Sequence, residues 1–391
     1  MKIGVLGAGT AGVVSILSML EVLYDSHALP HVEITCIHDS KTPITTVGES
    51  ASTAIYRMLF RLLNFDIIED VKEIDATLRY NTKYFWEKAN GNTFTVNYGY
   101  PGIHLNSEKF ASFVIDKLVR SGYNLKVVDD KIESIGFKSI TCEGGEYEFD
   151  YIIDSLGTPK NFNGYEVPEF VGVNSAVIYP HFQIYNEEYT SSYVHDNGWM
   201  FGVPLQHRKA FGYCYNNDYL SVDEAIDKFS ELKDIEREKL RYFSWKHYYK
   251  KEAYQDNTLY LGNKLYFFEP HQAIPLHYYM MLTQEFMKAV VGGWHDLDGL
   301  LNSYHNMSMK EIQDLIALNY AGRNSMDTPF WKDKKDQAVN RLKTSETFQS
   351  WGKTKLRGGY LDFWAQDARI MDQYINGYGI DLKELITDTA D

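Results

Sequence analysis

Three glycines near the beginning of the chain have the spacing of a nucleotide-binding loop. This loop lies between an apolar run, Lys2–Leu6, and a run with helical periodicity, and it contains Gly7, Gly9, Thr10, Ala11 and Gly12. In such loops the first glycine makes a tight turn, the second lets the backbone approach a pyrophosphate, and the third lets helix and strand pack closely. The helix N-terminus adds N–H groups and partial positive charge. Glycines also occur in turns without a ligand, but this context favours a nucleotide site.

Two more glycines follow predicted strand ends and indicate which nucleotide binds. Gly157 follows the apolar run Tyr151–Asp154 in an Asp-x-x-Gly pattern, and Gly262 follows the run 259–261. Three strand-to-glycine junctions suit one extended, retained cofactor, FAD, with Asp154 beside it. No second glycine fingerprint for NAD(P)H is visible in the sequence, so we expect a separate flavin reductase to supply reduced FAD.

The ribose hydroxyls of such a cofactor are commonly bound by an acidic residue at the end of the second strand. Here His38 and Asp39 follow the predicted strand 32–37. Either side chain can bind a ribose, and Asp39 can instead cap a turn. The sequence leaves these alternatives open.

The elements around these residues predict an α/β protein. A strand at residues 2–6, a helix at 10–24 and a strand at 32–37 form a βαβ unit, which implies a parallel sheet. We further expect helices at 52–63, 106–122, 222–230 and 278–291, strands at 78–86 and within 126–154, a β-rich stretch at 176–219, and a mainly helical stretch at 309–385 that breaks around 327–329. The predicted fold is therefore a Rossmann-type FAD-binding fold with a parallel sheet, an inserted antiparallel β-rich substrate region and a helical C-terminal part. We assign residues 1–310 to a flavin-monooxygenase-like module with the interleaved β-rich region, and 311–391 to a helical part that covers the substrate side.

Composition excludes several classes of partner. The 391 residues carry a net charge of −14, which argues against nucleic acid and anionic membranes as partners. Cys36, Cys142 and Cys214 lie far apart, so neither a disulfide framework nor a metal site is expected. No apolar stretch approaches about 18 residues, and we expect a soluble, cytoplasmic protein.

Five further motifs, together with the glycine loop, resemble the tryptophan halogenase family in the same chain order. They are Val47-Gly48-Glu49-Ser50, Asp75-Ala76-Thr77-Leu78-Arg79, Gly198-Trp199-Met200-Phe201-Gly202-Val203-Pro204, Phe268-Glu269-Pro270 and Asp327-Thr328-Pro329-Phe330-Trp331. In that family, reduced flavin, oxygen and halide give hypohalous acid, which travels through the protein to a lysine beside an aromatic substrate. The resemblance implies flavin contacts from Gly48, Glu49, Ser50 and Pro270, substrate or tunnel walls from Trp199, Phe201, Pro204, Phe330 and Trp331, and a halide site at Ile274 and Pro275.

The catalytic positions depart from the family pattern. Arg79 stands at the position of the lysine; a guanidinium donates hydrogen bonds in a fixed fork but does not deprotonate. Lys83 lies on the same face of the predicted strand but roughly 13 Å away, so it does not simply replace the lysine. Gln272 stands at the position of the catalytic glutamate and cannot accept the proton that leaves the ring, while Glu269 remains. Both cations also fit a solvated strand face without catalytic function.

These departures shape the predicted chemistry. Pro275 removes one N–H donor from the halide site. Since bromide and iodide are easier to oxidise than chloride, we expect them to be favoured. The predicted function is halogenation of an electron-rich aromatic compound of indole or phenol type. Two alternatives stay open: a flavin-dependent hydroxylase, which Arg79 and Gln272 favour, and a catalytically degenerate FAD-binding protein.

Overall fold

The computed structural model describes residues 1–42, 50–86, 93–271, 273–364 and 366–387. The chain forms two compact units, each assembled from three separate segments. The first unit comprises Met1–Ala76, Gly102–Glu166 and Tyr248–Asn306, and the second comprises Thr77–Pro101, Val167–His247 and Met307–Asp391. This grouping places the β-rich stretch with the C-terminal helices, whereas the sequence analysis assigned it to residues 1–310. The functional division at residue 310 stays a prediction.

The first unit is built on the predicted parallel sheet. Its strand order is β18-β19-β10-β1-β2-β6. The bounds are β1 Lys2–Leu6, β2 Glu33–His38, β6 Leu125–Asp129, β10 Tyr151–Asp154, β18 Tyr254–Gln255 and β19 Thr258–Tyr260. All neighbours pair in parallel except β18 and β19. The runs of β1 and β10 are apolar without alternation because helices and loops cover both faces of such a sheet.

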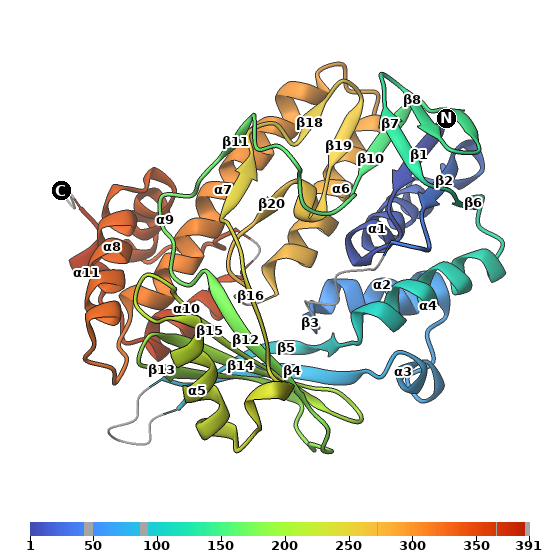
Figure 1. Ribbon diagram of the computed structural model, residues 1–391. Coiled ribbons are helices and arrows are strands. Elements are labelled where there is room, and N and C mark those ends of the chain that lie inside the picture. Colours follow the sequence, from blue (N-terminus) through green and yellow to red (C-terminus); the bar gives the residue numbers. More distant parts are fainter. Residues whose placement is uncertain (43–49, 87–92, 272, 365, 388–391) are drawn as a thin grey trace. The chain divides into compact units, whose positions relative to one another are not determined.

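Four helices of the first unit pack together, and α1 lies among the other three, with buried residues around most of its circumference. They are α1 Thr10–Asp25, α2 Thr53–Leu63, α4 Ser107–Arg120 and α6 Ile274–Val291, and α2, α4 and α6 all contact α1 (Figure 1). Asn106 caps α4 at the start of the helix predicted for residues 106–122, since its side chain accepts hydrogen bonds from the N–H groups of Glu108 and Lys109. Helix α6 begins four residues before the predicted start, because Pro275 suits a first helical turn.

Smaller elements complete the first unit. They are η1 Leu29–His31, β3 Ser50–Ala51, α3 Glu69–Glu73, β7 Ile132–Ile135, β8 Ser139–Cys142, β9 Gly145–Glu148, β11 Tyr165–Glu166, β17 Tyr248–Lys250, η3 Gly262–Lys264 and β20 Tyr266–Phe267. Strands β7, β8 and β9 form one small sheet, and β11, β17 and β20 form another. Strand β3 pairs with Ile103 and His104, the last residues of β5 (Phe94–His104).

The second unit contains the predicted β-rich region as one large sheet. Its strands follow the order β16-β12-β15-β14-β13-β4-β5. The bounds are β4 Thr77–Phe85, β5 Phe94–His104, β12 Ser175–His181, β13 Tyr189–His195, β14 Gly198–Pro204, β15 Lys209–Tyr215 and β16 Arg241–Ser244. Strand β13 pairs with β14 in antiparallel and with β4 in parallel fashion. Helix α5 (Val222–Lys233) packs Ala225 and Phe229 against buried residues of this sheet.

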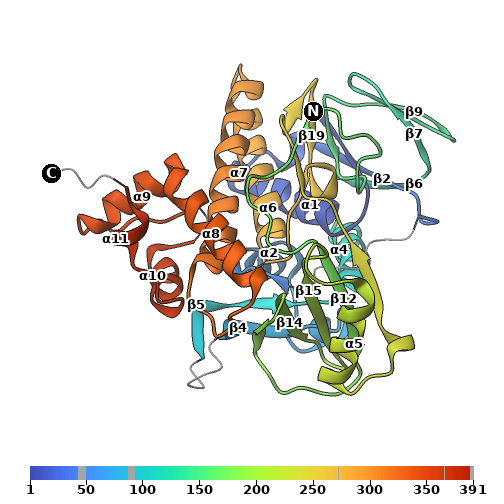
Figure 2. The ribbon, with the colours of Figure 1, turned by 60° about the vertical axis from the view of Figure 1, so that its left-hand side comes forward.

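The C-terminal part is helical, as predicted. Its helices are α7 Leu297–Ala321, α8 Pro329–Thr344, α9 Glu346–Leu356, α10 Ala368–Gly377 and α11 Leu382–Leu385. The second unit also contains a short helix earlier in the chain, η2 Arg237–Lys239. The break falls between α7 and α8, around the predicted residues 327–329. Figure 2 shows α8, α9 and α11 grouped together, in agreement with their contacts.

Two absences concern only the residues that the structure describes. No helix among them is long and apolar enough to cross a membrane. In the same residues, no group of three or more His, Cys, Asp or Glu side chains is arranged to hold a metal ion. The three cysteines are buried and unpaired with each other.

Candidate functional site

The glycine loop of the first unit has the backbone geometry that its sequence requires. Gly7 has φ +94°, a region that side chains disfavour, and its N–H donates to the carbonyl of Ile37 at 2.8 Å. A Cβ atom on Gly12 would lie 2.0 Å from the carbonyl oxygen of Gly7. The loop is therefore closed so tightly on itself that neither position accepts a side chain without rearrangement.

The N-terminus of α1 has no side-chain cap among the described residues. Gly9 is its N-cap, with φ −73°, and the first turn contains no acidic residue. The N–H groups at a helix start need acceptors, and they carry partial positive charge. Within the described part of the chain, these donors in the turn of Thr10 and Ala11 have the chemistry of a phosphate site.

Two other strand ends meet this loop. The N–H of Ser155 donates to the carbonyl of Leu6 at 3.0 Å, and the N–H of Leu261 donates to the carbonyl of Asp154 at 2.9 Å. Gly262 has φ +63°, and a Cβ on it would lie 3.0 Å from that of Ala11. The glycine loop and the ends of β10 and β19 are the three predicted junctions, and they are thus brought together. Gly157 (φ +65°) follows two residues after Ser155.

Asp154 is an ionisable group buried at this edge, with 1% of its surface exposed. Burial raises the pKa of its carboxyl, and Lys264, whose Nζ lies 3.5 Å from Oδ2, opposes that shift. The N–H of Leu156 donates to Oδ1 at 3.0 Å. Sequence analysis missed Lys264, although its position two residues after Gly262 was a usable signal.

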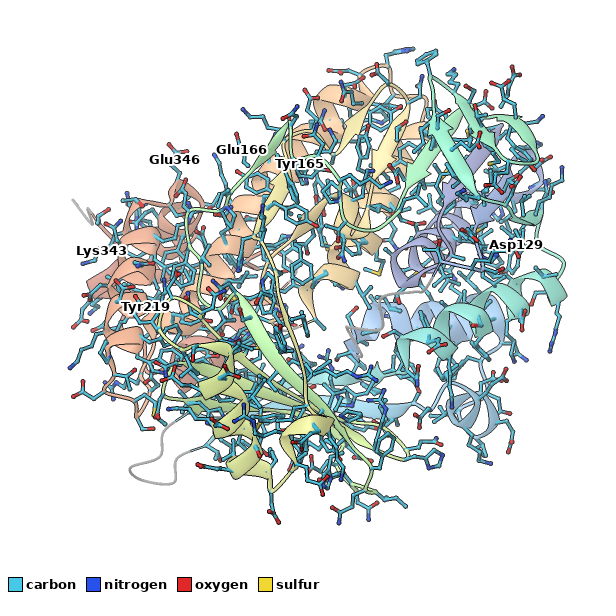
Figure 3. The ribbon with its side chains drawn as sticks, viewed as in Figure 1. Asp129, Tyr165, Glu166, Tyr219, Lys343 and Glu346 are labelled. Atoms are coloured by element: carbon cyan, nitrogen blue, oxygen red, sulfur yellow. The ribbon has the colours of Figure 1, made fainter. Side chains whose placement is uncertain are left out.

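Asp39 caps a turn, one of the alternatives left open. Its carboxylate accepts from the N–H of Lys41 and the hydroxyl of Thr42, both at 2.9 Å. Nearby, Asp129 at the end of β6 (labelled in Figure 3) accepts from the hydroxyl and N–H of Ser40 at 2.7 and 2.8 Å. These hydrogen bonds lower the pKa of the Asp129 carboxyl. Asp129 was not predicted from the sequence, since its partner Ser40 lies in another segment.

The flavin loop predicted by resemblance is described only at its last residue. Gly48 and Glu49 lie outside the described residues. Ser50 forms β3 and pairs with His104 of β5. Their role in flavin binding stays a prediction.

The predicted Glu269 and Pro270 lie before α6, and the predicted Ile274 and Pro275 begin the helix. Glu269 is buried, and its carbonyl accepts from the N–H of His271 at 2.8 Å. Burial lowers the pKa of His271 to about 3, so this imidazole is neutral at ordinary pH. Helix α6 starts without a side-chain cap after Ala273, with Pro275 in its first turn. Gln272 lies outside the described residues.

In the second unit, Arg79 and Lys83 have different surroundings. Arg79 is 5% exposed, which is incompatible with the solvated strand face considered for it. Its guanidinium carbon lies 4.7 Å from the ring centroid of Tyr98. Lys83 is only half-buried, with Nζ 5.2 Å from the Phe85 ring and 5.6 Å from the Tyr189 ring. The two cations therefore differ in burial and in the rings that they contact, and the distance expected between them stays a prediction.

The predicted tunnel residues mostly belong to a buried aromatic cluster of the second unit. The indole N–H of Trp199 donates to the hydroxyl of Tyr320 at 3.2 Å, and that of Trp331 donates to the carbonyl of His195 at 2.6 Å. Phe330 packs edge-on against Trp331 with centroids 5.1 Å apart. Phe201 is half-buried, 6.3 Å from Trp199, and Pro204 ends β14. Contact with substrate stays a prediction for these residues.

The parallel sheet, the closed glycine loop and the helix start beside it define a dinucleotide-binding α/β protein. The family model described as tryptophan halogenase matches residues 2–134 and 122–371. The chain therefore belongs to the tryptophan halogenase family.

Individual relatives are distant. The tryptophan 6-halogenase SttH of Streptomyces toxytricini is 25% identical over 238 residues, which cover 55% of this chain and 44% of that protein. The tryptophan 7-halogenase RebH of Lentzea aerocolonigenes is 22% identical over 261 residues, 60% of this chain and 47% of that protein. The matches thus span about half the length of these curated relatives.

Solved structures share the fold along nearly the full chain. A tryptophan halogenase from Shewanella frigidimarina superposes with a TM-score of 0.83 at 14% identity, covering 100% of this chain and 90% of that one. The flavin-dependent halogenase BrvH from Brevundimonas gives a TM-score of 0.79 at 17% identity, covering 97% and 89%. At these identities the likeness establishes the fold, which agrees with the predicted class.

Proposed function

We propose that this chain is a flavin-dependent halogenase that acts on an electron-rich aromatic compound of indole or phenol type. The observation that carries the proposal is the family match from residue 2 to residue 371, which includes the glycine loop at the first strand end. The sequence motifs resembling the family's flavin, catalytic and tunnel segments support it.

The residues of the first unit fit FAD. A side chain on Gly12 would fill the loop, and the amides that begin α1 have no side-chain cap in the described chain. Gly7, Gly9 and Gly12 with this helix start hold the pyrophosphate, and Asp39 or His38 contacts a ribose. Bound and reduced, FAD supplies the capacity to activate oxygen for halide oxidation. Because no second glycine fingerprint exists for NAD(P)H, a separate reductase delivers the reduced flavin.

In this proposal Arg79 positions the oxidant and Gln272 orients it. A guanidinium stays protonated, so it activates hypohalous acid through hydrogen bonds alone. An amide does not accept the ring proton, which passes to water. Trp199, Phe201, Pro204, Phe330 and Trp331 keep the passage dry, so that the electrophile survives until it meets the substrate.

The same reasoning predicts which halides give the faster turnover. Bromide and iodide form more reactive electrophiles and are easier to oxidise, so they tolerate a weak catalytic pair. Ile274 and Pro275 leave a halide site with one fewer N–H donor, which disfavours small, strongly hydrated chloride most. We therefore expect bromide or iodide turnover to exceed chloride turnover.

The test is aerobic turnover of one phenol and one indole with FAD, an added flavin reductase and NADH, with each halide in turn. A halogenated product, in the expected halide order, supports the proposal. Hydroxylated product would assign the chain to the monooxygenases, and peroxide alone would assign it to degenerate flavin binders. Equal turnover of chloride and bromide would refute the halide order.

Two variants of β4 provide the matched comparison. Arg79→Ala removes the proposed hydrogen-bond donors and should lower turnover by roughly tenfold or more, as expected for loss of a charged hydrogen bond. Lys83→Ala removes the half-buried cation from the same strand and should retain most activity. The opposite pattern would move the catalytic role to Lys83.

A further inference from the structure

The buried guanidinium of Arg79 has N–H groups that the described residues do not use as hydrogen-bond donors. None of the ion pairs that join described residues includes Arg79, and within those residues its buried Nε has no hydrogen-bond partner. Burial of a charge is costly unless hydrogen bonds or an opposite charge compensate. The contact that the structure provides is the ring of Tyr98, at 4.7 Å. The guanidinium therefore keeps N–H groups for a small polar guest next to that ring.

Tyr98 is held in place beside Arg79. Its hydroxyl lies 2.8 Å from Oγ1 of Thr82 on β4. The side chain is half-buried on β5. A phenol is one of the most electron-rich rings in a protein, and its carbons next to the hydroxyl react readily with electrophilic halogen. A fixed phenol thus lies within reach of any oxidant held by Arg79.

We propose that Tyr98 is a halogenation site of this protein itself, modified during turnover when no other aromatic substrate is bound. The inference rests on the proposed function, because the hypohalous acid comes from that reaction. In the step, the ring carbon next to the Tyr98 hydroxyl forms a bond to the halogen as the bond between halogen and oxygen breaks. The ring proton and the released hydroxide combine to water, so no further reactant is needed.

Other tyrosines have different positions. Tyr84, Tyr374 and Tyr378 are buried in an aromatic cluster of the second unit, with Tyr84 6.1 and 5.6 Å from the other two rings. Tyr100, two residues after Tyr98, is 68% exposed. Free hypohalous acid in solution meets Tyr100 first, whereas an oxidant held by Arg79 meets Tyr98 first. The site of modification therefore reports where the oxidant is held.

The experiment is turnover of the full chain with FAD, an added flavin reductase, NADH, oxygen and bromide, without an organic substrate. Peptide mass spectrometry then measures replacement of hydrogen by bromine at each tyrosine. Tyr98 should carry most of the bromine, while the same protein treated with hypobromite from solution should carry it mainly at exposed tyrosines such as Tyr100 and Tyr360. Arg79→Ala should reduce bromination of Tyr98 about tenfold or more. An added phenol should compete with Tyr98.

Two matched variants and a parallel reaction with an added phenol distinguish failure of this inference from failure of the proposed function. Tyr98→Phe should abolish the modification, and Tyr100→Phe should leave it unchanged; circular dichroism and an unchanged denaturation midpoint show that both variants fold. Bromination of an added phenol without any at Tyr98 overturns this inference and leaves the proposed function standing. Equal bromination of Tyr98 and Tyr100 also overturns it. If neither phenol nor protein is brominated, the proposed function fails, and this inference fails with it.

Discussion

Gly9 and Gly12 lack side chains for different physical reasons. Gly12 is required by the protein itself, since a Cβ atom would lie 2.0 Å from the carbonyl oxygen of Gly7. Gly9 has φ −73°, which any residue adopts at a helix cap, so its backbone conformation does not demand glycine. Its lack of a side chain would let a pyrophosphate approach the helix start closely. Substitution at Gly9 therefore separates cofactor binding from folding.

We predict that Gly9→Val loses FAD while the chain still folds. The branched side chain blocks the close approach of backbone and pyrophosphate. Flavin retained after gel filtration measures the loss, and circular dichroism measures the fold. Gly12→Ala is the comparison and should damage both. Undiminished FAD affinity in Gly9→Val would count heavily against this site.

At the scale of elements, the motif Asp327–Trp331 begins a helix. Thr328 caps α8: its hydroxyl accepts from the N–H of Trp331 at 3.4 Å and donates to the carbonyl of Asp196 at 2.6 Å. Pro329 occupies the first turn, where its missing N–H costs nothing. Trp331 lies in the same first turn and is buried. Part of this family motif therefore has a structural function.

We predict that Thr328→Ala lowers the free energy of unfolding by about 1 kcal/mol, the usual effect of losing a helix cap. Denaturant unfolding at equilibrium measures it. Thr344→Ala, at the other end of α8, is the control and should have a smaller effect, because its hydroxyl bonds only to carbonyls of its own helix. If Thr328→Ala and the unmodified protein have the same free energy of unfolding, the Thr328 cap does not stabilise α8.

At the scale of the molecule, the proposed FAD contacts in the glycine loop and at β10 and β19 belong to the first unit. A ligand that binds only the folded state stabilises it by mass action. The large sheet and the C-terminal helices of the second unit carry the proposed catalytic Arg79 and the aromatic cluster. Removal of flavin should therefore affect the two units differently.

We predict that saturating FAD raises the unfolding free energy, by about 2.7 kcal/mol when free FAD is roughly 100 times the dissociation constant. Thermal melts over a range of FAD concentrations test this. Hydrogen exchange should show added protection at residues 7–12 and 154–157 of the first unit. A melting temperature that does not respond to FAD would be inconsistent with the proposed cofactor.

Much of the fold was predictable because it depends on local rules. The strand–glycine–helix order gave the parallel sheet, Asn106 gave the start of α4, and the residues around Pro329 gave the break between α7 and α8. Each of these depends on neighbours within a few residues in sequence. The start of α6 was misjudged because its first turn, with Pro275, does not continue the apolar periodicity.

The sequence by itself determined the cofactor fold, the order of the family motifs and the chemical limits of Arg79 as a permanently charged donor. Only the tertiary structure decided that Arg79 is buried, that Tyr98 lies against it, and that Asp39 caps a turn while Asp129 binds Ser40. It also paired Asp154 with Lys264, and packed Trp199 and Trp331 into an aromatic cluster. The physical reason is that these contacts join residues from different strands and helices. Their meeting depends on sheet register and helix packing, which no local pattern encodes.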